Sequence, residues 1–106
     1  MPADVPELAA IFFAATRELA GHTGSLQERL AETYADHLLQ VVADDLPPEL
    51  RPVFRELETR MNAVEASEAD DDPFRAAAQL LTEAEARALI HRIVALYGRL
   101  AELAAR

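Results

Sequence analysis

Helix-start signatures recur along this chain and divide most of it into helices. In a capping box, an N-capping side chain and a glutamate three residues later bond amide hydrogens that the first turn leaves free. Three pairs of residues have this spacing, namely Asp4 and Glu7, Ser25 and Glu28, and Thr82 and Glu85. A fourth start is indicated where Asp72 precedes Pro73, because proline is well tolerated in the first helical turn.

These signatures predict where the helices run. We expect a first helix over residues 5–20, a second from Ser25 to about Asp44, a short one over 73–80, and a last one from Thr82 onwards. A third helix begins between Pro48 and Pro52. Residues 66–72, with three consecutive aspartates, form the only segment typical of an irregular loop.

The apolar pattern differs between helices. The third helix has a narrow stripe about 100° wide, as expected of an ordinary outer helix. The first helix is apolar almost all round, and Phe12 and Phe13 point to different sides of it. In the last helix the apolar positions, which include Ile90, Val94 and Tyr97, spread over roughly 180°. The first and last helices therefore carry more apolar surface than a small monomer needs.

Composition agrees with an all-helical fold. The 106 residues include only 3 glycines and no cysteine, so packing rather than disulfides must supply the stability. No strand-like alternation and no internal repeat is present. The prediction is all-α: residues 1–106 form a single compact bundle of four main helices plus one short helix, assembled as a homodimer.

The charge of the chain restricts its partners. A formal net charge of −9 disfavours direct binding to nucleic acids or to anionic membranes. All ten basic residues are arginine, which we interpret as the signature of a GC-rich bacterial genome. With no cysteine, no secretory signal pattern and no apolar run near the roughly 20 residues of a membrane span, we expect a cytoplasmic protein.

No known catalytic or metal-binding motif is present, so we expect no cofactor and no metal. His22 lies in a turn, and His91 lies on the polar side of the last helix. His37 falls inside the apolar arc of the second helix, one turn from Tyr34. These two residues are the candidate lining of a ligand pocket.

Three functions remain open from the sequence. The leading hypothesis is a non-enzymatic interaction module that self-associates and docks a protein partner. Its candidate interface residues are Phe12, Phe13, Ile90, Val94 and Tyr97. The alternatives are a ligand-binding or enzymatic bundle with a cavity near His37 and Tyr34, and an acidic mimic of nucleic acid.

Overall fold

The computed structural model describes residues 3–64 and 72–106, and all of its regular structure is helical. Its α-helices are α1 (Val5–Gly21), α2 (Leu26–His37), α3 (Arg51–Met61), α4 (Pro73–Gln79) and α5 (Glu83–Ala104). Three single 3-10 turns, Leu38–Gln40, Ala43–Asp45 and Pro48–Leu50, connect α2 to α3. No strand occurs in the described ranges, which confirms the all-α prediction. The predicted loop at 66–72 lies outside them, apart from Asp72.

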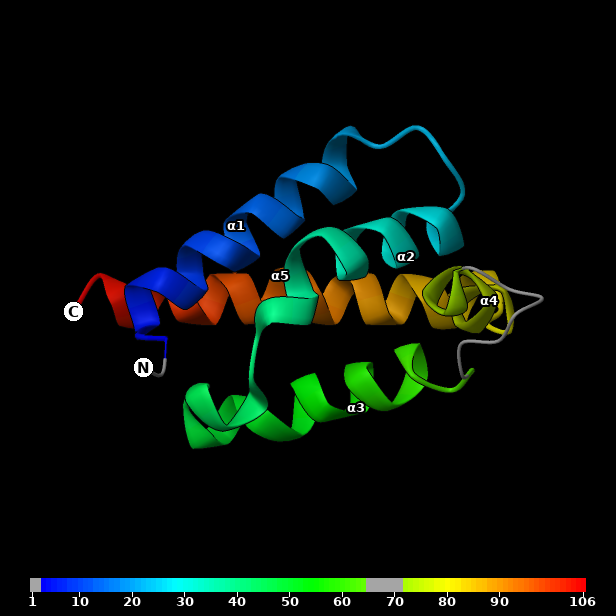
Figure 1. Ribbon diagram of the computed structural model, residues 1–106. Helices are drawn as coiled ribbons and strands as arrows, with labels where there is room; N and C mark the ends of the chain where they lie inside the picture. Colours follow the sequence, from blue (N-terminus) through cyan, green and yellow to red (C-terminus); the bar gives the residue numbers. More distant parts are fainter. Residues whose placement is uncertain (1–2, 65–71) are drawn as a thin grey trace.

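The longest helix, α5, runs along the molecule, and the others pack around it (Figure 1). α1 crosses α5 on one side and α3 lies on the other, while α2 packs against both α1 and α5. The short α4 lies against α2 at one end. The molecule measures 46 × 28 × 19 Å, so it is about two helices thick at axis spacings of roughly 8–10 Å.

The core forms where α1, α2, α3 and α5 meet. The contact between α1 and α5 is the most extensive in the molecule. The rings of Phe12 on α1 and Phe54 on α3 meet edge to face at 6.0 Å, and both side chains are fully buried. The largest fully buried aliphatic side chains around them are Leu8, Leu30, Leu38, Leu46, Leu57, Met61, Ile93 and Leu100.

All four predicted helix starts are present. The side chains of Asp4, Ser25, Asp72 and Thr82 each accept a bond from the amide three residues on. At Thr82 the box is complete, because the Glu85 carboxylate also accepts the Thr82 amide hydrogen at 2.9 Å.

The predicted end of the second helix is wrong. α2 ends at His37, and the chain to Asp45 forms two 3-10 turns instead of continuing to Asp44. Val41 and Val42 adopt extended backbone angles between these turns, as suits β-branched residues. Leu38 and Val41 are nevertheless buried as expected, because positions three apart lie on the same side in both helix types.

α3 starts at Arg51, inside the predicted interval, after the 3-10 turn Pro48–Leu50. The helix ends at Met61, and its buried residues are Phe54, Leu57 and Met61. No helix in the described part of the chain is long and apolar enough to cross a bilayer.

Candidate functional site

The outer side of α1 and α5 carries a group of apolar side chains that the core does not enclose. The rings of Phe13 and Tyr97 meet across the two helices at 5.6 Å, and the Arg17 guanidinium lies 5.9 Å above the Phe13 ring. Phe13 is 47% exposed and Val94 is 42% exposed, while Ile90 and Tyr97 are half-buried. We call the surface formed by these five residues the α1–α5 face.

Phe12 does not belong to this face. It was predicted to be an interface residue, but it is fully buried against Phe54. A single molecule therefore accommodates both phenylalanines: Phe12 enters the core and Phe13 packs on Tyr97. The surplus apolar surface is smaller than the sequence indicated.

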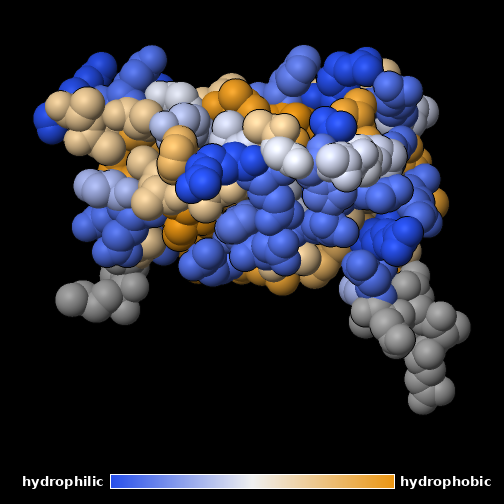
Figure 2. All heavy atoms as spheres, turned by 90° about the horizontal axis from the view of Figure 1, so that it is seen from above, coloured by the Kyte–Doolittle hydropathy of each residue, from blue (hydrophilic) through white to orange (hydrophobic). Residues whose placement is uncertain are grey.

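Viewed from the α1 side, hydrophobic atoms appear as separate patches between hydrophilic side chains (Figure 2). Other large exposed apolar residues of the described chain are Leu39, Val42 and Leu80. Leu39 lies on a 3-10 turn, Val42 lies between two such turns, and Leu80 follows the end of α4. The α1–α5 face differs from them because its apolar side chains come from two packed helices.

The helices that form this face lack carboxylates where they meet. Residues 8–17 of α1 and 86–101 of α5 contain no aspartate or glutamate, although the chain has 19 such residues. Arg17 forms no ion pair with another described residue. The stretches of α1 and α5 that form this face thus contribute no negative charge to an acidic molecule, although Glu56 and Glu49 pair with Arg92 and Arg99 of α5. The sequence contains this signal as two stretches without aspartate or glutamate, which the pattern of apolar residues alone does not reveal.

Gly98 lies in the middle of α5, next to this face, and is exposed. A methyl group added there would contact nothing within 4 Å in the same chain. Its backbone does not require glycine either, because no described residue has a positive φ. Glycine inside a helix costs about 1 kcal/mol relative to alanine. Nothing within the described chain explains that cost.

His37 and Tyr34, the predicted pocket residues, lie on different sides of α2, and only His37 lines the depression described here. His37 faces α1, where its Nε2 lies 3.0 Å from Oε1 of Glu18, and the two side chains are about one quarter exposed. The buried hydroxyl of Thr33 donates to the other oxygen of Glu18 at 3.4 Å. With Ala14 and Arg17, this pair lines an open depression of about 330 Å³.

Tyr34 is buried on another side of α2, with its ring 5.1 Å from that of Phe74. Its hydroxyl accepts a hydrogen bond from the Asn62 amide at 3.3 Å. Burial raises the pKa of the phenol; the Asn62 bond opposes this and the Glu58 carboxylate adds to it. Burial also raises the pKa of Glu58. Tyr34 is therefore a core residue of the described structure.

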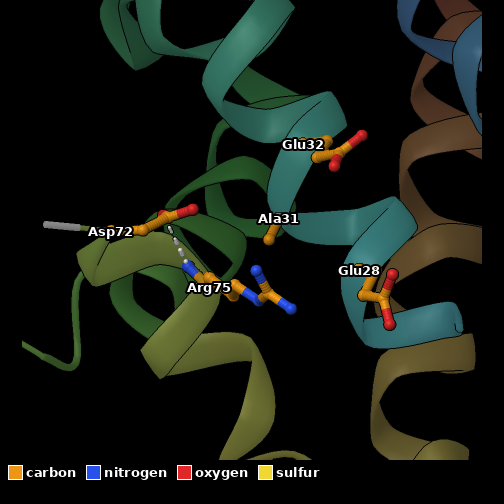
Figure 3. Close-up of a pocket in the computed structure, with 5 residues that line it drawn as sticks. All are labelled: Glu28, Ala31, Glu32, Asp72 and Arg75. Atoms are coloured by element: carbon orange, nitrogen blue, oxygen red, sulfur yellow. Dashed lines mark hydrogen bonds between the residues drawn. The ribbon is translucent and has the colours of Figure 1, made fainter. Parts of the chain in front are cut away.

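A small pocket lies between α2 and α4 (Figure 3). Arg75 of α4 extends towards α2, which contributes Glu28 and Glu32, and the Arg75 amide donates to Asp72. The space measures about 60 Å³, well below the roughly 300–1,000 Å³ of ordinary ligand sites. Glu32 also bonds the ring of His22. The small space between these side chains leaves little room for a ligand.

The acidic side chains of the described ranges bear on two further chemistries, mimicry of nucleic acid and metal binding. The acidic-mimic hypothesis requires a regular row of carboxylates, and α2 offers Glu28, Glu32 and Asp36, spaced four apart and exposed. Two of these three line the pocket around Arg75, which makes the row short. Within the described ranges, no three His, Asp or Glu side chains are grouped so that they could hold a metal ion.

The three comparisons with known proteins give no further information. No family model, no curated protein and no solved structure matches this chain significantly.

Proposed function

We propose that this protein is a non-enzymatic interaction module that self-associates through the α1–α5 face. One observation carries the proposal: Phe13 and Val94 are nearly half exposed on two packed helices whose meeting stretches have no carboxylate. Full burial of such side chains is worth roughly 1.5–3 kcal/mol each. A second copy that covers both would recover part of that free energy.

Charge favours this face over the rest of the surface for self-association. Each molecule carries a formal charge of −9, so two copies repel one another wherever acidic surfaces meet. The α1–α5 face presents the Arg17 guanidinium and no carboxylate of its own. Two copies that meet there keep most of their carboxylates apart, and two-fold dimers are the commonest symmetric assembly.

Sedimentation equilibrium tests the proposal with three proteins. The unaltered chain is expected to reach twice 11.7 kDa as its concentration rises, and Val94→Glu is expected to remain near 11.7 kDa. Leu80→Glu is the matched control, because Leu80 is 69% exposed and lies outside the face. It should dimerise like the unaltered chain. A mass of 11.7 kDa for the unaltered chain at all concentrations would refute self-association.

The depression at His37 supports a second candidate function, the binding of a small ligand. Glu18 holds one ring nitrogen of His37, and the other nitrogen has no hydrogen bond to a described residue. Arg17, which has no ion-pair partner in the described chain, lines the same depression. An NMR titration with small carboxylic acids tests this role. Shifts confined to these side chains support it, and unchanged spectra at millimolar ligand exclude it.

A further inference from the structure

The side of α5 that faces away from the core is exposed along its length. At 100° per residue this side lies opposite the buried positions Ala86, Leu89, Ile93, Leu96 and Leu100. We call it the outward ridge of α5, and all of its residues are exposed. They are Ala84, Arg87, Ala88, His91, Val94, Ala95, Gly98 and Glu102, of which all but Ala84 and Glu102 fall in the carboxylate-free stretch. Val94 belongs to both the ridge and the α1–α5 face.

The outward ridge is complementary to itself in one direction. The midpoint between Val94 and Ala95 is a centre of symmetry for this ridge. Arg87 and Glu102 lie at equal distances on either side of it, and His91 and Gly98 form a second such pair. If two copies of α5 lie antiparallel about that midpoint, each arginine faces a glutamate. If they lie parallel in register, Arg87 faces Arg87 and Glu102 faces Glu102. Opposite charges stabilise such contacts and like charges oppose them.

We infer that a second copy of this chain docks on the outward ridge and on the Val94 edge of the α1–α5 face, with its α5 antiparallel to the first and centred between Val94 and Ala95. This inference rests on the proposed function and adds the orientation and the register. Val94 meets Val94 of the second copy at the centre, and Gly98 lies opposite His91. The missing side chain of Gly98 provides the space for that ring, which gives this glycine a role that its own chain does not.

Existing ion pairs are compatible with this register. Arg87 already bonds Glu83 at 3.0 Å, and Glu102 bonds Arg99 at 3.0 Å. Arg99 also lies 3.9 Å from a Glu49 oxygen. All these side chains are more than one third exposed, so Arg87 has room for a second carboxylate and Glu102 for a second guanidinium. The dimer thus joins two existing pairs into an alternating set of four charges at each end of the ridge.

Cysteine cross-linking tests the register directly, because the chain has no cysteine of its own. Under mild oxidation, Val94→Cys is expected to form a covalent dimer, since the two thiols lie beside the two-fold axis. Ala84→Cys is the control: its two copies lie about 30 Å apart along the helix axis at 1.5 Å per residue, so no bond is expected. Efficient cross-linking at Ala84 and none at Val94 would overturn the register.

A charge exchange tests the pairing of Arg87 with Glu102. An exposed ion pair contributes about 0.2–1 kcal/mol, and the dimer has two such contacts, so Arg87→Glu should raise the dissociation constant by roughly 2–30-fold. Glu102→Arg should do the same, and the double variant should restore the original value. Circular dichroism verifies that each variant is folded. If the unaltered chain dimerises but the double variant is no better than the singles, the register is wrong and the proposed function stands. If the unaltered chain is a monomer, both fail.

Discussion

Two neighbouring phenylalanines show how one position along a helix decides the role of a side chain. Phe12 is fully buried against Phe54, and Phe13 is 47% exposed on the α1–α5 face. We expect Phe12→Ala to lower the free energy of unfolding by about 3–5 kcal/mol, because it removes a buried ring and leaves a cavity. Phe13→Ala should cost about 1 kcal/mol or less, since a half-exposed ring gives up less buried area.

Urea unfolding at low protein concentration measures both losses without a contribution from self-association. Equal losses for the two variants would contradict the burial described above. The comparison has its own control, because the substitution is the same at both positions and only the surroundings differ.

The burial of Tyr34 leads us to predict a loss of stability at alkaline pH. Burial raises the pKa of its phenol above the ordinary value of 10.0 in the folded protein. The neutral form is therefore favoured by folding, and its contribution to stability is fully present below pH 10.0 and is lost as the pH rises through the folded-state value. Tyr34→Phe should reduce the loss of stability between pH 9 and pH 11.

Urea unfolding at the two pH values, compared with the unaltered chain, measures this difference. Tyr97→Phe is the matched control, since it removes the only other tyrosine, which is half-buried on the α1–α5 face. If Tyr34→Phe and the unaltered chain lose the same stability, the phenol does not titrate as its burial requires.

At the scale of the element, the start of α5 depends on a single capping box. Thr82 and Glu85 each bond the other's backbone amide, and Glu85 also accepts from Arg60 at 2.8 Å. We expect Thr82→Ala to cost about 1 kcal/mol, within the usual range of about 0.5–2 for a lost cap. Thermal unfolding checks this value, and an unchanged melting temperature would show that the box adds nothing.

The same capping box makes the stability of the protein depend on pH in the acid range. The bonds from Thr82 and Arg60 hold the pKa of Glu85 below its ordinary value of 4.5. A depressed folded-state pKa stabilises the protein above pH 4.5, and this contribution is lost as the pH falls through the folded value. In the Glu85→Gln variant, the free energy of unfolding should therefore lose less than in the unaltered chain as the pH falls through this range.

Gly98 predicts opposite effects on folding and on assembly. Alanine at this position should stabilise the monomer by about 1 kcal/mol, because glycine is a poor helix residue and the added methyl meets nothing in its own chain. The same methyl should weaken the dimer, since it occupies the space that we assign to His91 of the second copy. Melting temperature at low concentration and sedimentation measure the two effects separately. A Gly98→Ala variant that dimerises more tightly would contradict this packing.

The sequence predicted helix starts better than helix ends. Each start depends on a bond between side chain and backbone only three residues apart, as at Thr82 and Glu85. The end of α2 depends on the extended backbone of Val41 and Val42, while the helical period and the 3-10 turn place Leu38 and Val41 on the same side. The apolar periodicity alone could not distinguish a continued α-helix from a 3-10 turn followed by extended residues.

The candidate site shows a similar division. The exposure of Phe13 and Val94 followed from the width of the apolar surface, but the fate of Phe12 did not. A helical wheel gives the direction of a side chain and not what covers it. Phe12 is covered by Phe54, which belongs to another helix far away in the sequence.

At the scale of the whole molecule, charge is distributed unevenly. The carboxylates of α2 lie on one part of the surface, while the stretch 86–101 of α5 has none. A large net charge opposes association, and a local absence of carboxylates favours the approach of two copies there. The formal net charge of −9 alone would suggest that two copies repel one another at every surface, which the placement of the carboxylates does not support.

The pairing of α1 with α5 also determines when the protein can fold. α1 ends at Gly21 and α5 begins at Glu83, so all the other helices are synthesised between them. At about 5–20 residues per second, a ribosome needs roughly 3–12 s to cover that interval. During this time the side of α1 that carries Leu8 and Phe12 lacks its main partner. Synthesis, rather than the finished state, is therefore the period in which this chain most needs protection from aggregation.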